Sequence, residues 1–104
     1  MAQLITIYWR DIPAQVIGRS GRTRVKAELS SRFADAIDSA AMRAGRGGSD
    51  EYLADWRRDR RPCSGDLEQT VTEEVARLEA AFPESVLRAM VRGNGLAPQP
   101  EPTQ

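Results

Sequence analysis

The chain has 104 residues, of which 40% are hydrophobic, and its fifteen Lys and Arg residues balance its fifteen Asp and Glu residues. This length and hydrophobic content suit one small domain with a single core. Because the charges cancel and the sequence pI is about 6.3, the chain is unlike the strongly basic domains usual among nucleic-acid-binding proteins. No apolar run reaches the roughly 20 residues of a membrane-spanning helix, and the first residues lack a secretion signal, so we expect a cytoplasmic protein outside the membrane.

The beginning of the chain predicts two strands joined by a turn. Residues 4–9 are β-rich and apolar on both alternating sides, which is typical of a strand covered on both faces. On this pattern Trp9 shares a buried face with Ile5. Residues 11–13 break the strand, because Pro13 disfavours helix at Ile12 and suits a turn or a strand edge, and residues 14–19 then resume the extended pattern.

A third strand follows a flexible pair at 20–21 and shows the clearest alternation in the sequence. One of its faces is apolar, and the other carries Arg22, Arg24 and Lys26, close to Arg19 of the preceding strand. These four cations can follow a phosphate backbone. The alternative is a solvated strand whose cations prevent pairing with other chains. Because the strand has no interleaved aromatic residues, the pattern favours the second interpretation.

From Ser30 onward the apolar period changes from two to about 3.6, which predicts helices. We expect them over residues 31–44, 50–61, 67–82 and 84–92. The second of these would end in a basic cluster of Arg57, Arg58, Arg60 and Arg61. The expected fold is therefore α+β, a three-stranded antiparallel sheet followed by about four helices packed on it. Residues 1–93 would form the single domain, and residues 94–104 a disordered proline-rich tail.

Two counts restrict the chemistry of the chain, since it has no histidine and a single cysteine, Cys63. Without histidine there is no Ser–His or Cys–His nucleophile and no imidazole metal ligand. One cysteine cannot build a zinc or iron–sulfur site within the chain. We therefore expect no metal and no cofactor, and favour a non-catalytic protein over an enzyme. Cys63 follows several arginines that would favour its reactive thiolate; the alternative is an inert, packed thiol.

Four segments in order resemble a small bacterial family called the virulence factor domain. They are YWRDIPAQV (8–16), AIDSAAMRAG (36–45), SDEYLADWRR (49–58) and PCSGDLE (62–68), within a resemblance that covers residues 3–92. The family is related to a domain of the conserved virulence factor C proteins, which is found beside HEAT-type repeats and a scaffold-like domain of iron–sulfur assembly. Short forms occur near genes of one-carbon and corrinoid methyl transfer. The resemblance implies an interaction module and supplies no catalytic residues.

We therefore expect a non-catalytic accessory or scaffold protein, monomeric or homodimeric, that binds a protein partner in iron–sulfur or one-carbon metabolism. The residues assigned to the partner are Trp9, Arg10, Asp11, Arg22, Arg24, Lys26, Trp56, Arg57 and Arg60. In this arrangement Asp11 neutralises part of the basic cluster and Arg10 stays available to an acidic partner. The main alternative is a small nucleic-acid-binding protein that uses the basic strand face. A redox or ligand-accepting role for Cys63 and a homodimer whose exposed surface is its own interface also remain open.

Overall fold

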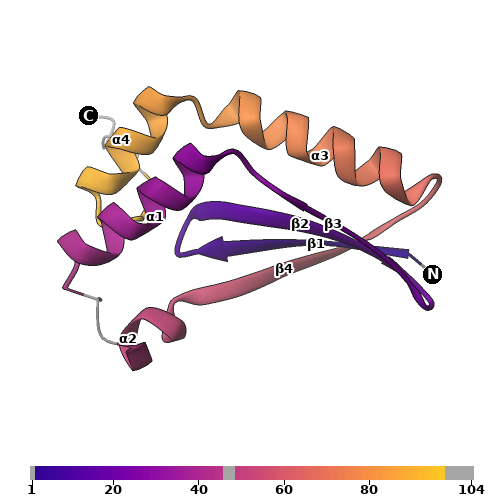
Figure 1. Cartoon of the computed structure of the whole chain (residues 1–104), viewed down its shortest axis with the longest axis horizontal. Helices are drawn as coiled ribbons and strands as arrows, with labels where there is room; N and C mark the ends of the chain where they lie inside the picture. Colours follow the sequence, from indigo (N-terminus) through magenta and orange to yellow (C-terminus); the bar gives the residue numbers. More distant parts are fainter. Residues whose placement is uncertain (1, 46–48, 98–104) are drawn as a thin grey trace, which may run out of the picture.

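The computed structural model describes residues 2–45 and 49–97, which form an antiparallel sheet with helices (Figure 1). The elements along the chain are β1 (Ala2–Trp9), β2 (Ile12–Ser20), β3 (Thr23–Glu28), α1 (Ser31–Arg43), α2 (Ser49–Ala54), β4 (Trp56–Cys63), α3 (Leu67–Ala81) and α4 (Glu84–Arg92). The strands lie in the order β3-β2-β1-β4, and every neighbouring pair is antiparallel. The predicted α+β class is confirmed.

The sheet has four strands, so the prediction of three is wrong. The expected helix over residues 50–61 stops at Ala54, and Trp56–Cys63 pairs with β1 instead. β1 is apolar on both faces and would present an unpaired edge if β2 were its only neighbour. The charges and Pro62 of β4 are what an edge strand tolerates. Because β4 lies between α2 and α3, the helices do not simply follow the sheet.

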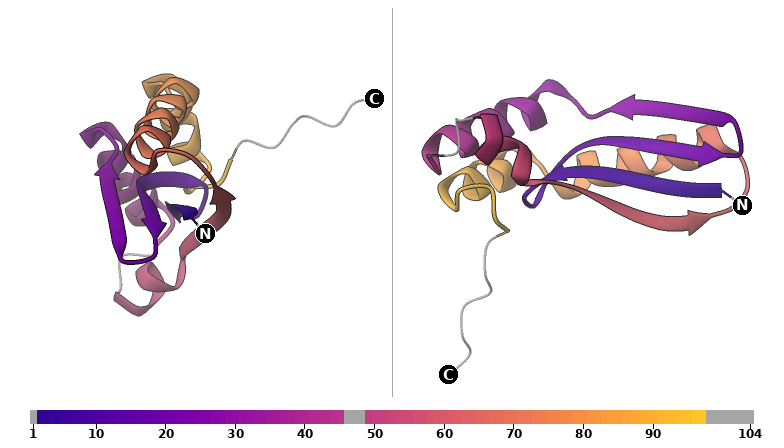
Figure 2. Two further views of the ribbon diagram at one scale, coloured as in Figure 1. Left: turned by 90° about the vertical axis from the view of Figure 1, so that its right-hand side faces the viewer. Right: turned by 90° about the horizontal axis from the view of Figure 1, so that it is seen from below.

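Three helices, α1, α3 and α4, lie on one side of the sheet, which we call the covered face (Figures 1 and 2). The core beneath them includes Leu4, Val16, Leu29, Phe33, Ile37, Ala40, Val71, Leu78, Leu87 and Met90. At Gly18 in β2 the helix α3 comes so close that an added Cβ would lie 2.7 Å from Val71 Cγ2. Asp66 caps α3 by accepting a hydrogen bond from the Gln69 backbone at 3.1 Å.

The turn between β1 and β2 is tight, and its backbone is hydrogen-bonded to Asp55 before β4 and to Gly95 after α4. Arg10 has a φ of 53°, and the strand resumes at Ile12, so the turn precedes the position predicted from Pro13. The segment after α4 is fixed to this turn, because the Asp11 backbone N–H donates to the Gly95 carbonyl at 3.0 Å. Residues 94–97, predicted as part of the tail, thus contact the domain. The remainder of the predicted tail, 98–104, lies outside the described residues.

Trp9 is fully buried, as the sequence predicts, but it does not belong to the cluster of Ile5 and Ile7. Its ring stacks on Tyr52 of α2 at a centroid distance of 6.0 Å, and its indole N–H donates to the Tyr52 carbonyl at 3.0 Å. Gly95 also packs closely against the ring. Trp9 therefore joins β1 to α2 and to the segment after α4. None of the helices described is long and apolar enough to cross a membrane.

Candidate interaction surface on the open sheet face

The side of the sheet opposite α1, α3 and α4 is called the open face here. In the described part of the chain no helix covers its length, and α2 lies at one end (Figure 2). Ile5, Ile7 and Ile17 project from this side and form a cluster separate from the main core. Ile5 pairs with Ile17 in β2, so the isoleucines occupy the two central strands. We call these three residues the isoleucine strip.

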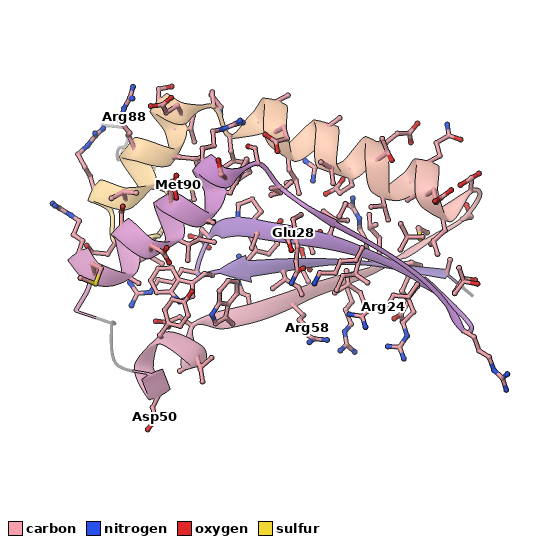
Figure 3. All side chains as sticks on the ribbon, viewed as in Figure 1. Arg24, Glu28, Asp50, Arg58, Arg88 and Met90 are labelled. Atoms are coloured by element: carbon pink, nitrogen blue, oxygen red, sulfur yellow. The ribbon has the colours of Figure 1, made fainter. Side chains whose placement is uncertain are left out.

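Cations surround the isoleucine strip on the open face. They are Arg19 of β2, Arg24 and Lys26 of β3, and Arg58 and Arg60 of β4. Strand register places them there, because Lys26 pairs with Ile17 and Arg60 with Ile5. Figure 3 shows Arg24 and Arg58 directed away from the helices. We call the five residues the cationic frame.

Among the described side chains the cationic frame has no partner of opposite charge. Its five side chains are exposed, and within residues 2–45 and 49–97 none of them forms an ion pair. The acidic strand residue on this face is Glu28, which pairs with Gln15. The open face therefore carries a local positive charge in a protein whose overall charge is zero. Such a local field attracts negatively charged partners.

Two hollows lie along the isoleucine strip. The first has a volume of about 480 Å³ and is lined by Ile5, Ile17, Arg19, Gly21, Arg22, Thr23, Arg24 and Arg58. The second has a volume of about 490 Å³ and is lined by Ile7, Gln15, Trp56, Arg57 and Arg58. Ile5 and Ile17 are each only 3% exposed, and Trp56 packs against their cluster. Each hollow thus has an apolar floor and cationic walls.

On the covered face, by contrast, the arginines of β4 meet carboxylates. Glu74 of α3 is 6% exposed and accepts hydrogen bonds from Arg61 of β4, at 2.8 Å, and from Arg77. The Arg77 hydrogen bond, helped by the charge of Arg61, lowers the pKa of Glu74 despite its burial. Arg77 lies three residues after Glu74 in α3, so Glu74 accepts from one arginine of its own helix and from one of the sheet. The alternation of β4 brings Arg61 beneath α3, which no local helical pattern reveals.

The turn cluster predicted to meet a partner is largely engaged within the chain. Arg10 forms an ion pair with Asp55 at 3.3 Å and donates to the Asn94 carbonyl at 2.9 Å, and its side chain is 19% exposed. The sequence predicts that Arg10 is available to an acidic partner, but these contacts engage its side chain within the chain. Asp11 pairs with Arg57 at 3.2 Å, so the predicted neutralisation of Arg57 is confirmed, although Arg57 belongs to a strand.

Arg57 also lies against Tyr8. Its guanidinium carbon stands 4.5 Å from the centre of the Tyr8 ring. Burial, helped by the nearby charge of Asp59, raises the pKa of Tyr8. These contacts fix the β1–β2 turn to the first residues of β4.

The structure divides the predicted site residues into two groups. Arg24, Lys26 and Arg60 come together on the open face, with Arg22 at the edge of the first hollow and Trp56 at the second. The other group, at the β1–β2 turn, contains Trp9, Arg10, Asp11 and Arg57.

Sequence reasoning did not assign Arg58 or the isoleucine strip to this surface. The signal was present in WRRDRRPC, because a two-residue period places Trp56, Arg58 and Arg60 on one face. Cys63 is partly buried at the end of β4 and packs against the main core. Among the described residues no group of three metal-ligating side chains is close enough to hold an ion.

The fold and surface define a small antiparallel sheet domain with a helical layer on one face and a cationic frame on the other. A family model described as Virulence factor matches residues 7–91. The chain belongs to this family, in agreement with the resemblance seen in its sequence. No curated protein and no solved structure matches the chain.

Proposed function

We propose that this protein is a non-catalytic accessory protein that binds a protein partner through the open face of its sheet. The observation that carries the proposal is the cationic frame around the isoleucine strip, in a sheet whose opposite face is fully packed. A sheet commonly has its apolar face covered by another layer. Clustered like charges repel one another in the free protein, and an acidic partner relieves that repulsion. Both considerations favour a surface that is occupied in a complex.

A nucleic acid is the second candidate, because a cationic sheet face attracts phosphate. Proteins that bind single strands in this way also stack bases on aromatic side chains. The floor of the open face is aliphatic, and of its described strand residues only Trp56, at one end, is aromatic. Aliphatic and acidic side chains of a protein fit this floor and its cationic walls better than bases do.

The family resemblance gives the candidates for the partner. It connects the accessory role to iron–sulfur assembly or to corrinoid methyl transfer, and we propose a partner from one of these systems. The open face does not discriminate between them, because its chemistry recognises an acidic protein surface and not a cofactor.

Affinity capture from cells of the source organism tests the proposal. The tagged wild-type protein is compared with the double variant Arg24→Glu/Arg60→Glu, which reverses two charges of the cationic frame. The matched control is Arg88→Glu/Arg92→Glu, which changes the net charge equally on exposed α4 positions. We expect a protein that is retained by the wild type and the control and is lost with the open-face variant. Equal retention by both variants would exclude the open face as the binding surface.

A further inference from the structure

We propose that the occupant of the open face is an acidic amphipathic α-helix of the partner, with its apolar stripe on the isoleucine strip and its carboxylates against the cationic frame. This inference rests on the proposed function and gives the partner's chemistry. Three observations support it. They are the separation of the cations on the open face, the spacing of its two hollows, and the contact that β4 makes with a helix on the covered face.

The width of the open face fits a helix. The isoleucine strip occupies the central strands β1 and β2, while Arg24 and Lys26 stand on the outer strand β3 and Arg58 and Arg60 on the outer strand β4. Strands are about 4.8 Å apart, so β3 and β4 are separated by about 14 Å. An α-helix with its side chains is about 10–12 Å wide. It fills the space between the two rows, whereas a single extended strand does not reach both.

The spacing of the hollows fits the same occupant. The first hollow has Ile5 in its floor and the second has Ile7, two residues further along β1. Two residues of a strand span about 7 Å. Side chains at positions i and i+4 of a helix are about 6 Å apart along its axis. Two successive apolar side chains of one helical stripe can therefore enter the two hollows together.

The covered face provides an internal example of this contact. There the acidic side chain Glu74 of α3 reaches down to Arg61 of β4. The two neighbours Arg58 and Arg60 project to the other side of the same strand, where the described residues offer them no carboxylate. A second helix with the acidic character of α3 would complete the same contact on the open face and give a three-layer arrangement.

Charge argues against the other occupants. A second copy of the chain would bring two cationic frames together, with Glu28 as the one acidic residue among the described strand residues of each open face, and like charges in an interface are strongly unfavourable. Carboxylates on both flanks of a helix match the two outer strands, and arginine binds carboxylates in a bidentate manner. A helix with apolar residues at i and i+4 can pack them on the isoleucine strip, while Asp or Glu residues beside them pair with the cationic frame.

Site-specific photocrosslinking tests this inference. A photoreactive amino acid replaces Gln15 in the floor of the second hollow, and in the control it replaces Ala76, an exposed residue of α3 on the covered side. After irradiation in cells of the source organism, the adduct is purified and the crosslinked segment is identified by mass spectrometry. A synthetic peptide of that segment is then examined by circular dichroism and titrated against the full chain.

We expect a protein adduct from the Gln15 position and not from the Ala76 position. Its crosslinked segment should be net negative, should become helical on binding, and should bind Arg60→Gln about tenfold more weakly than the wild type, the effect of one charge-assisted hydrogen bond. A crosslinked segment that binds in an extended form, or that lacks acidic residues, would overturn the helix while leaving the proposed function intact. A nuclease-sensitive adduct, an adduct of two copies of the chain, or no adduct at Gln15 would overturn both.

Discussion

On the covered face of the sheet an arginine of β4 pairs with a carboxylate of the same chain, whereas on the open face the neighbouring arginines pair with none of the carboxylates that the structure describes. Arg61 binds Glu74 at 2.8 Å beneath α3, while Arg58 and Arg60 stand on the other side of the same strand. The alternation of one strand thus places its arginines in two environments. Arg61 contacts α3, and we propose that Arg58 and Arg60, of the other parity, bind a partner. Substitutions on the two faces test this separation.

The largest loss of stability is expected at Trp9, which joins β1 to α2 and to the segment after α4. Trp9→Ala should lower the free energy of unfolding by about 3–5 kcal/mol, because it removes a large buried ring and leaves a cavity. Chemical denaturation followed by circular dichroism measures the change. The control Leu53→Ala alters a side chain of α2 that is 63% exposed, and it should change stability by no more than about 0.5 kcal/mol. Equal effects of the two substitutions would contradict the packing described for Trp9.

Gly18→Ala tests how tightly the covered face is packed. The added methyl group would lie 2.7 Å from Val71 and 2.9 Å from Leu67, so these side chains of α3 must shift to admit it. We expect a loss of about 1–3 kcal/mol, which is typical of overpacking. Gln3→Ala on the exposed surface of β1 serves as the control and should leave the denaturation midpoint nearly unchanged. A Gly18→Ala protein as stable as the wild type would mean that α3 does not contact β2 as described.

Glu74→Gln removes the charge that holds β4 to α3. Because Arg61 and Arg77 are each 56% exposed, solvent weakens the contact, and we expect a loss of about 1–2 kcal/mol at pH 7. The folded-state pKa of Glu74 lies below its ordinary value of 4.5, so the carboxylate stabilises the fold above that pH. This contribution disappears as the pH falls through the folded-state pKa.

The difference in unfolding free energy between the wild type and Glu74→Gln should therefore shrink in acid. Denaturation series at pH 7 and at progressively lower pH measure it. The neighbouring substitution Glu73→Gln, at an exposed position, is the control and should have little effect at any pH. A difference that stays constant with pH would show that the charge of Glu74 does not stabilise the domain.

The smallest effect on stability is expected from the open-face cations of β3 and the turn before it. Replacing Arg22, Arg24 and Lys26 together by Ser should change the free energy of unfolding by no more than about 0.5 kcal/mol, because all three side chains are exposed and unpaired in the described structure. A thermal melt provides the measurement. If this triple variant unfolds, the three cations stabilise the domain, and the two faces do not differ in the way described.

Most of the fold follows from local sequence patterns. The strand alternation of residues 23–28 and the helical periods of α1, α3 and α4 predict those elements to within a residue or two of their observed ends. β4 is different, because its charged sequence fits a helix end at least as well as a strand. Its conformation is decided by pairing with β1, across more than forty residues of chain. A local pattern carries no information about such a partner.

The residues of the candidate site were also predictable only in part. The alternation of β3 is sufficient to place Arg24 and Lys26 on one exposed face, and the structure confirms that placement. Arg58 and Arg60 join that face only because β4 is a strand. The predicted availability of Arg10 is wrong for a related reason. Asp55, which neutralises Arg10, is brought to the turn by the start of β4.

Two adjacent arginines of β4 allow the most direct test of the contrast between the faces. Arg60→Gln and Arg61→Gln are the same chemical change, one on the open face and one on the covered face. For each variant the midpoint of thermal unfolding and the yield of the captured partner protein are measured together. Arg60→Gln should reduce the yield and leave the midpoint unchanged, whereas Arg61→Gln should retain the yield and lower stability by up to about 1 kcal/mol. Two variants that behave alike in both measurements would contradict the separation of roles between the two faces.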